Sequence, residues 1–312
     1  MVGAGGRRVP RLRRVPDPHR PGDPGVRRRA RTLSGAPDER PVAVVTGASD
    51  GIGAAAARRL HRAGWRVVAV GRSPEKTAAI GAEVGVETAV ADFARLEDVR
   101  RLAADLTARL PRIDVLAGNA GATFGRPGRT VDGIEQTFQV DHLAPYLLTR
   151  LLEEPLRAGG GRVVTTSSGA HWLGGVRRGR LAGLAEVPRP YAGMLVYSRA
   201  KWANVLFTRE LARRWAPDVT ATSFEPGAVA TSFAQASRGV AGLVFRSPLR
   251  AFMRTPAQGA DTLVWLATAE EGWRDGGHHS DRSPARTLPS AADDVRAREL
   301  WDLSARLVGL PA

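Results

Sequence analysis

The stretch PVAVVTGASDGIGAAAARRLHRAGW, residues 41–65, decides the fold. Its apolar run at 42–46 predicts a short strand, and the alanine-rich run that ends near residue 63 predicts a helix. Between them lies the glycine turn TGASDGIG (46–53). Glycine lets a backbone turn tightly and approach a phosphate group, which the free N–H groups of the helix start then stabilise. The unit predicts a nucleotide-binding turn, with a purely structural turn as the alternative, and its candidate contacts are Gly47, Ser49, Asp50, Gly51, Ile52 and Gly53.

The same alternation of short apolar runs and helical stretches continues along the chain. Continuous apolar strands separated by helices are typical of a parallel sheet that is covered on both faces. Right-handed crossovers then give an α/β fold, a single-domain Rossmann-type doubly wound parallel sheet of about seven strands with helices on both faces. No linker or repeat divides residues 41–312. Further strands are expected at 65–70, 85–90, 113–118, 161–166 and 218–224, and helices at 74–82, 95–110, 131–153, 193–214 and 256–270.

Composition excludes several kinds of chemistry. The 312 residues include 43% hydrophobic residues and no cysteine. The lack of cysteine excludes disulfides, a thiolate nucleophile and cysteine-ligated zinc. There is no run of about 18 apolar residues. We therefore expect no transmembrane segment, and a cytoplasmic location.

Nearly half of the net charge of +15 lies in residues 1–40, which hold eleven arginines against four acidic residues. This segment is rich in proline and glycine and has no apolar periodicity, so it predicts a disordered extension. No apolar run follows its arginines, so we do not expect a secretion signal. An arm that binds nucleic acid or an anionic membrane is the alternative. We expect no nucleic-acid partner.

The end of the second predicted strand, VVAVGRSPEK (67–76), bears on the choice of nucleotide. A protein that binds NAD usually places a carboxylate here, against the ribose 2′-hydroxyl. This chain has Gly71 at that position, followed by Arg72 and Ser73. A guanidinium group is a natural partner for a 2′-phosphate. The pattern favours NADP(H), although a single arginine in an arginine-rich chain could also be incidental.

The tyrosine and lysine in YSRAK (197–201) predict acid–base chemistry. The chain has 46 lysine and arginine residues together, of which only Lys76 and Lys201 are lysines. Four residues apart on a helix, Tyr197 and Lys201 lie on one face. A tyrosine near pKa 10 becomes an effective acid or base at neutral pH when a nearby positive charge stabilises its phenolate. A chance pairing on a surface helix is the alternative.

Besides the glycine turn and YSRAK, the chain contains Asp92, GNAG (118–121), TTSS (165–168) and EPGAVAT (225–231). Taken together, these motifs resemble the short-chain dehydrogenase/reductase family over roughly residues 41–310. Within that family, the chain looks most like the branch of the retinol dehydrogenases and the WW-domain oxidoreductase. The resemblance implies hydride transfer between the coenzyme NADP(H) and a small-molecule carbonyl/alcohol substrate.

The resemblance also implies roles for single residues. Ser168 would orient the substrate carbonyl beside Tyr197 and Lys201, with the adjacent Ser167 as its rival. Residues near the ends of the third and fourth strands would hold the adenosine half of the coenzyme and brace the sheet. Thr231 would contact the carboxamide, with a helix cap as its alternative role. The remaining implied coenzyme contacts are Asp92, Phe93, Asn119, Ala120, Gly121, Pro226 and Gly227.

One position departs from the family pattern. The fourth catalytic residue of the family is an asparagine in a pattern resembling VNHLGHF, and this chain reads VDHLAPY, with Asp141 there and Pro145 nearby. This departure supports an alternative function, a catalytically weak NADP(H)-binding regulatory or interaction protein. We interpret His142 as a packing or surface residue. His278 and His279 have no cysteine or carboxylate cluster near them in the sequence, so no metal site is predicted.

Residues 232–255 follow the expected coenzyme loop and mix apolar residues with arginines. In the family this region forms a lid over the substrate. Its apolar content favours a lipophilic substrate, although a mixed helix packed on the core would look similar. A basic amphipathic lid could also touch a membrane surface. A homo-oligomer is compatible with the sequence.

Overall fold

A computed structural model describes residues 40–229 and 253–312. Several predictions fall outside these residues. They are the disordered extension up to residue 39, the role of Thr231, and the lid except for its last three residues.

The described chain folds around one eight-stranded sheet with the strand order β3-β2-β1-β4-β5-β6-β7-β8. Strands β1 to β7 pair in parallel, which confirms the predicted doubly wound α/β fold. An eighth, two-residue strand pairs antiparallel to β7 at one edge and was not predicted. The strands are β1 (Val42–Thr46), β2 (Arg66–Gly71), β3 (Glu87–Val90), β4 (Val115–Gly118), β5 (Arg162–Thr166), β6 (Thr220–Phe224), β7 (His278–Ser280) and β8 (Ser283–Pro284).

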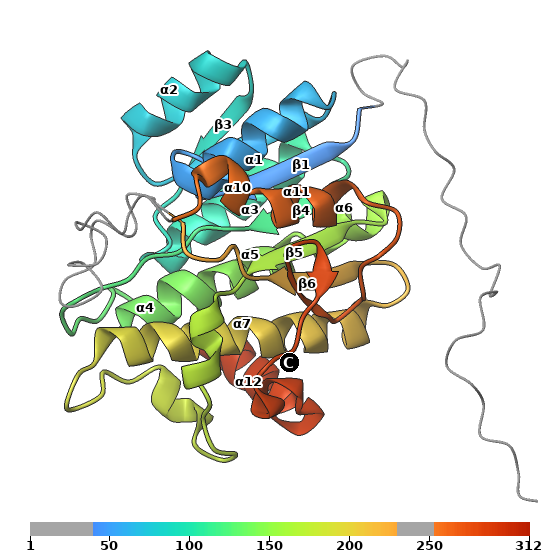
Figure 1. Cartoon of the computed structure of the whole chain (residues 1–312). Helices are drawn as coiled ribbons and strands as arrows, with labels where there is room; N and C mark the ends of the chain where they lie inside the picture. Colours follow the sequence, from blue (N-terminus) through green and yellow to red (C-terminus); the bar gives the residue numbers. More distant parts are fainter. Residues whose placement is uncertain (1–39, 230–252) are drawn as a thin grey trace, which may run out of the picture. The chain divides into compact units, whose positions relative to one another are not determined.

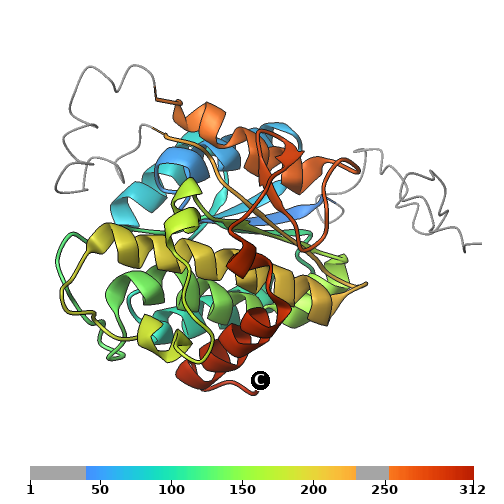
Figure 2. The same cartoon turned by 60° about the horizontal axis from the view of Figure 1, so that its bottom comes forward.

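Helices cover both faces of the sheet, as Figures 1 and 2 show. Helices α1, α2, α10 and α11 lie on one face, and α3, α5, α7 and α12 on the other. The helices are α1 (Gly51–Arg62), α2 (Pro74–Val84), α3 (Leu96–Arg109), α4 (Gln136–Phe138), α5 (Ala144–Leu151), α6 (Glu153–Gly159), α7 (Gly193–Trp215), α10 (Pro256–Gly259), α11 (Asp261–Thr268) and α12 (Asp294–Leu307). Shorter turns of helix are η2 (Gln139–Leu143), η3 (Gly169–Leu173), η4 (Leu181–Leu184) and η6 (Pro289–Ala292).

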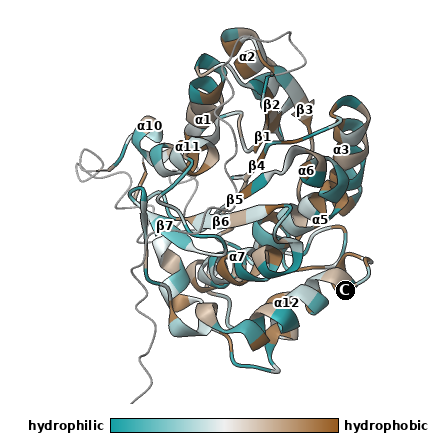
Figure 3. Cartoon of the chain, turned by 90° about the vertical axis from the view of Figure 1, so that its right-hand side faces the viewer, coloured by the Kyte–Doolittle hydropathy of each residue, from teal (hydrophilic) through white to brown (hydrophobic). Residues whose placement is uncertain are grey.

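The hydrophobic core has two layers because successive side chains of a strand point to opposite faces of the sheet. In β1, Val44 belongs to the layer under α3, α5 and α7, and Val45 belongs to the layer under α1 and α11. All five residues of β1 are buried. The hydropathy colours in Figure 3 show hydrophobic residues along the central strands. Burial on both faces explains why the strands appear in the sequence as continuous apolar runs.

The helix predicted over 131–153 is interrupted. It begins at α4, passes through the π-helical turn η2 and continues as α5. Pro145 lies in the first turn of α5, next to this join. Proline lacks a backbone N–H, and it is tolerated where the regular helical hydrogen-bond ladder is already broken. The proline that looked unusual therefore fits the π-helical turn before it.

Strand β7, the C-terminal helix α12, helix α6 and the short turns η3, η4 and η6 were also not predicted from the sequence. Helix α12 packs against α7 and buries Leu300 and Trp301 in the core. None of the described helices is both long and apolar enough to cross a membrane.

Candidate active site

The glycine turn brings the end of β1, the start of α1 and the end of β4 into close contact. Gly47 adopts φ 65°, a conformation that favours glycine. A Cβ atom on Gly47 would lie 2.8 Å from the Ala120 Cα, and one on Gly53 would lie 2.3 Å from the Gly47 carbonyl oxygen. Any side chain at either position would force these backbones apart. Gly53 therefore serves close packing and does not line the coenzyme cavity.

A hydrogen-bonded brace joins β1 to β4 beside this turn. The Asn119 side chain donates to the Thr46 carbonyl oxygen at 3.0 Å. The Thr46 hydroxyl accepts from the backbone N–H groups of Asn119 and Ala120, each at 3.0 Å. Asn119 was expected to brace the sheet, whereas Thr46 was not among the predicted site residues. That threonine ends a buried strand and begins the glycine turn, and this position was the clue to its role.

A large cavity of about 1070 Å³ runs along the carboxyl ends of the strands. Ligands bind at this edge in open α/β sheets. Of the predicted site residues that the structure describes, Gly53 and Asp141 do not line the cavity, whereas the others do. Lining residues that the sequence analysis did not include are Lys76, Ala122, Thr123, Phe124, Gly125, Arg126, Pro127, Gln136, Val140, Ala170, Met194, Ala228 and Val229, with others near them.

One end of the cavity lies beside the end of β2. Arg72 and Lys76 line it, and both are exposed. Ser73 caps α2 by accepting from the Lys76 backbone N–H at 3.3 Å. A Cβ atom on Gly71 would lie 2.1 Å from Thr77 Oγ1, so no acidic side chain fits there. Two cationic side chains therefore face this end of the cavity, and one of them, Lys76, is one of the two lysines of the chain.

At the other end of the cavity, Ser168, Tyr197 and Lys201 lie together. The Ser168 side chain lies beside the Tyr197 phenol and favours its ionised form, which lowers the pKa of Tyr197. Lys201 Nζ lies 5.4 Å from the centre of the Tyr197 ring, and both residues are buried. The Ser167 hydroxyl instead donates to the Lys201 backbone carbonyl at 2.9 Å. The two adjacent serines thus have different partners, and Ser168 is the one beside the phenol.

The protonation of this group depends on burial and on two charges. Burial raises the pKa of Tyr197, Lys201 lowers it, and Asp141 raises it further. Burial opposes the charged form of Lys201, but Asp141 and Tyr197 together raise the pKa of this lysine above its usual value. Tyr197 is therefore a protonated phenol at neutral pH, and Lys201 is an ammonium group.

Asp141 forms a buried ion pair with the catalytic candidate Lys201. Its Oδ2 lies 3.1 Å from Lys201 Nζ, and its Oδ1 accepts from the Ala122 backbone N–H at 2.7 Å. Burial raises the pKa of Asp141, while the lysine and the Ala122 N–H oppose that rise. The aspartate is thus placed behind Lys201, where its charge offsets the charge of the lysine.

Asn204 holds the backbone at this departure from the family pattern. Its amide nitrogen donates to the carbonyl oxygens of Asp141 and Thr166, at 3.0 and 3.1 Å. Its oxygen lies 3.1 Å from His142 Nδ1, and His142 Nε2 lies 3.0 Å from the Ser304 hydroxyl. His142 is fully buried, which agrees with the packing role. Asn204 was not a predicted site residue, although its rarity, as one of two asparagines, could have identified it.

The fold and the cavity define a nicotinamide-dependent oxidoreductase, and comparisons with known proteins identify the family. A model of the short chain dehydrogenase family matches residues 41–179. A protein of Streptomyces sp. (strain C5), named as a daunorubicin C-13 ketoreductase, DnrU, is 44% identical over 85% of this chain and 92% of its own. Human retinol dehydrogenase 14 is 35% identical over 98% of this chain and 92% of its own. The chain belongs to the short-chain dehydrogenase family, and it is an oxidoreductase that acts on alcohol or carbonyl groups.

Solved structures agree with this assignment. A protein from Mycobacterium Paratuberculosis is similar with a TM-score of 0.70 and 30% identity, over 88% of this chain and 96% of that one. A short chain dehydrogenase from Shigella flexneri 2a str. 301, solved in complex with NADP, has a TM-score of 0.58 and 25% identity, over 76% of this chain and 95% of that one. The predicted resemblance to the family and to its retinol dehydrogenase branch is confirmed.

Proposed function

We propose that this oxidoreductase prefers NADP(H) over NAD(H), acts on a lipophilic carbonyl/alcohol pair, and works mainly as a reductase. The observation that carries the proposal is the shared cavity, in which Tyr197, Lys201 and Ser168 lie at one end and Arg72 at the other.

The catalytic end supplies proton transfer and orientation. The nicotinamide coenzyme supplies the hydride in reduction and accepts it in oxidation. The Ser168 hydroxyl hydrogen-bonds to the substrate oxygen and holds it beside the Tyr197 phenol. Tyr197 donates its proton to that oxygen as negative charge develops on it. Lys201 stabilises the phenolate that remains, and the surrounding protein keeps bulk water away from this transfer.

The direction of the reaction follows from the protonation of Tyr197. Reduction needs a phenol that can donate, whereas oxidation needs a phenolate that can accept. Burial and the nearby Asp141 both raise the pKa of Tyr197, and the protonated form is favoured at neutral pH. The protonated phenol is the form that reduction requires, and the Streptomyces relative is named as a ketoreductase, so reduction is the direction that we propose.

Coenzyme preference rests on the end of the cavity beside β2. Arg72 forms no ion pair with the described residues, and Lys76 lines the same end. A guanidinium fork and an ammonium group together suit a 2′-phosphate. Gly71 leaves no room for the carboxylate that would instead hold a 2′-hydroxyl. The complex of the Shigella flexneri relative with NADP is consistent with this preference.

The preference for a lipophilic substrate rests on the lining near Tyr197. Phe124, Val140 and Met194 line the cavity together with Ala122 and Ala170. Met194 is 46% exposed one turn before Tyr197, so its apolar side chain is available to a ligand. Relatives named as retinol dehydrogenases and as a mouse polyprenol dehydrogenase, which is 37% identical over 86% of this chain, also point to apolar substrates.

A tyrosine substitution tests the catalytic assignment. Tyr197→Phe keeps the ring but removes the transferable proton, so turnover with NADPH and the best substrate of an apolar ketone and aldehyde panel should fall at least about 10²-fold. NADPH should still bind, as measured by fluorescence titration. The matched control is Tyr146→Phe, which removes a phenol buried in the core. A wild-type protein that binds NADPH but reduces nothing on the panel would instead favour the regulatory alternative.

An arginine substitution tests the coenzyme preference. Wild-type protein should bind NADPH at least about tenfold tighter than NADH, since a charge-assisted hydrogen bond contributes about 1.5–3 kcal/mol. Arg72→Asp should abolish or reverse that preference in the same titrations. Arg177→Asp is the control, because Arg177 is also exposed but does not line the cavity. Equal affinities of the wild type for the two coenzymes would contradict the assignment of Arg72.

A further inference from the structure

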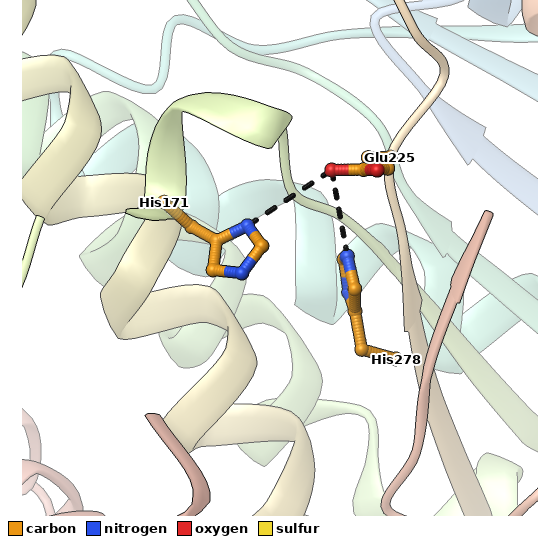
Figure 4. A group of neighbouring side chains, drawn as sticks. All are labelled: His171, Glu225 and His278. Carbon is orange, nitrogen blue, oxygen red and sulfur yellow. Dashed lines mark ion pairs between the residues drawn. The ribbon is translucent and has the colours of Figure 1, made fainter. Parts of the chain in front are cut away.

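Three side chains from distant parts of the chain converge behind the catalytic serine. His171 lies in η3, directly after Ser168, while Glu225 follows β6 and His278 begins β7. One donor atom from each of the three lies within 4.8 Å of the others. Figure 4 shows the two imidazole rings and the carboxylate facing a common space. None of the three lines the large cavity, so this cluster is separate from the coenzyme and substrate site.

Each of the three side chains has a buried polar atom without a hydrogen-bond partner. Within the described residues, Glu225 Oε2, His171 Nε2 and His278 Nε2 are buried without one. The His278 Nε2–Glu225 Oε2 distance is 3.8 Å and the His171 Nδ1–Glu225 Oε2 distance is 4.0 Å, both beyond hydrogen-bond length. Buried polar atoms without partners are costly and rare in native proteins. Three in one place indicate that something else satisfies them.

Each ring is held in place through its Nδ1 atom, which in His171 is also the nitrogen that faces Glu225. His278 Nδ1 lies 3.0 Å from the Ser223 hydroxyl, and His171 Nδ1 lies 2.8 Å from the Ser168 carbonyl oxygen. Histidines that bind metals commonly use one nitrogen for the ion and hydrogen-bond through the other. In this cluster, Nε2 of each histidine is the nitrogen left without a partner.

We propose that His171, Glu225 and His278 form a binding site for a divalent transition-metal ion of the zinc type. Two imidazoles and one carboxylate are a donor set that zinc accepts, with a fourth position open to water. Tetrahedral bonds of about 2.1 Å require donor atoms about 3.4 Å apart. The cluster must therefore close slightly around the ion. Binding through His171 Nδ1 would release the Ser168 carbonyl, and binding through Nε2 requires the ring to turn. In both cases His171 is the donor that moves.

The position of the cluster suggests what the ion does. It would join three segments, of which η3 follows Ser168 and the segment after β6 continues into Pro226 and Gly227. Ser168, Pro226 and Gly227 line the catalytic cavity. The ion would thus stiffen the wall of that cavity without touching the reacting atoms. The Glu225 side chain is 23% exposed, which gives the ion a route of entry.

Metal titration of the whole chain tests this proposal. Protein without an affinity tag is treated with a chelator, desalted, and titrated with Zn²⁺ by calorimetry, with Mg²⁺ as a comparison ion. We expect one equivalent of Zn²⁺ to bind with a Kd below about 10 µM, together with a rise in melting temperature. Mg²⁺ should produce neither effect, since it prefers oxygen donors. Absence of saturable Zn²⁺ binding would overturn the proposal.

Variants locate the ion. Glu225→Gln and His278→Gln should each weaken Zn²⁺ binding at least tenfold, while His61→Gln, which changes a histidine outside the cluster, should leave it unchanged. Circular dichroism checks that the variants fold. His278→Phe provides a second route if the glutamine variant unfolds, because an aromatic ring keeps the buried position filled but carries no metal-binding nitrogen. Variants that bind Zn²⁺ like the wild type would overturn the site. These measurements need no coenzyme, so they are independent of the proposed function.

Discussion

At the scale of single residues, Asp141 distinguishes this site most clearly from the family pattern. A neutral asparagine there would leave the full charge of Lys201 acting on Tyr197. Here a buried carboxylate lies 3.1 Å from Lys201 Nζ and offsets part of that charge. Removing a buried charge commonly changes the pKa of a neighbouring group by about 1 unit or more. We therefore expect Asp141 to tune Tyr197, the proposed proton donor, without lining the cavity.

We expect the Asp141→Asn substitution to shift the pH profile of the reduction rate. Reduction requires the Tyr197 phenol, so its rate falls as the pH rises through the pKa of Tyr197. Asp141 raises that pKa, and Asp141→Asn should move the fall to lower pH by about 1 unit or more. Turnover at pH 7 should change by less than about tenfold. NADPH oxidation rates from pH 7 to about pH 11.5 provide the measurement, because the pKa of Tyr197 is raised from 10, and Asp105→Asn serves as a surface control. Superimposable profiles would mean that Asp141 does not act on Tyr197.

At the scale of elements, helix α7 organises the site. This helix has 23 residues and carries Tyr197, Lys201 and Asn204 along one side, which faces β5 and the π-helical turn η2. The π-helical turn contains Asp141, and the Asn204 side chain donates a hydrogen bond to the backbone carbonyl of that residue. Extra residues per turn of this kind are often found at functional sites.

Removal of the Asn204 side chain should therefore cost both stability and activity. Asn204→Ala leaves the carbonyl groups of Asp141 and Thr166 buried without their donor, which should lower the free energy of unfolding by about 2–4 kcal/mol. Thr208→Val is the control on the same helix, since its hydroxyl bonds only the Asn204 carbonyl, and it should cost about 1 kcal/mol or less. Urea unfolding monitored by circular dichroism compares the two. Equal losses would show that Asn204 has no special role.

At the scale of the whole molecule, His142 links segments that are far apart in the sequence. It bonds to Asn204 of α7 and to Ser304 of α12. Its ring also stacks on Phe138 at 5.1 Å. Burial is the main reason that the pKa of His142 is lowered from 6.5 to about 4. The folded protein therefore holds this imidazole neutral across the pH range in which the unfolded chain protonates it.

This difference predicts a loss of global stability in mild acid. Below pH 6.5 the unfolded chain binds a proton at His142 that the folded protein excludes until about pH 4. The contribution of His142 to the free energy of unfolding is thus fully present above pH 6.5. It falls as the pH decreases toward 4, by up to about 3 kcal/mol. Urea unfolding at pH 7.5 and 4.5 measures the loss. His142→Gln should reduce it, His61→Gln should not, and an unchanged loss in His142→Gln would refute this account.

The sequence by itself determined the parts of this protein that depend on neighbours along the chain. The glycine turn and the apolar strand before it predicted the nucleotide-binding unit, because φ preferences and burial patterns are local. Tyr197 and Lys201 could be paired for the same reason, since residues four apart share a face in any helix. The sequence also showed Asp141 as a departure. It did not reveal the break in the helix over 131–153, because a π-helical turn depends on partners such as Asn204.

Tertiary structure alone decided which distant residues meet. Asp141 and Lys201 form an ion pair because η2 packs on α7, which no spacing in the sequence encodes. The lack of a cysteine or carboxylate cluster near His278 in the sequence argued against a metal site there. The pairing of β6 with β7 then brings Glu225 beside His278, and the turn after β5 brings His171. In a parallel sheet, strand ends from separate crossovers lie at one edge, so chemistry dispersed along the chain is collected there by the fold.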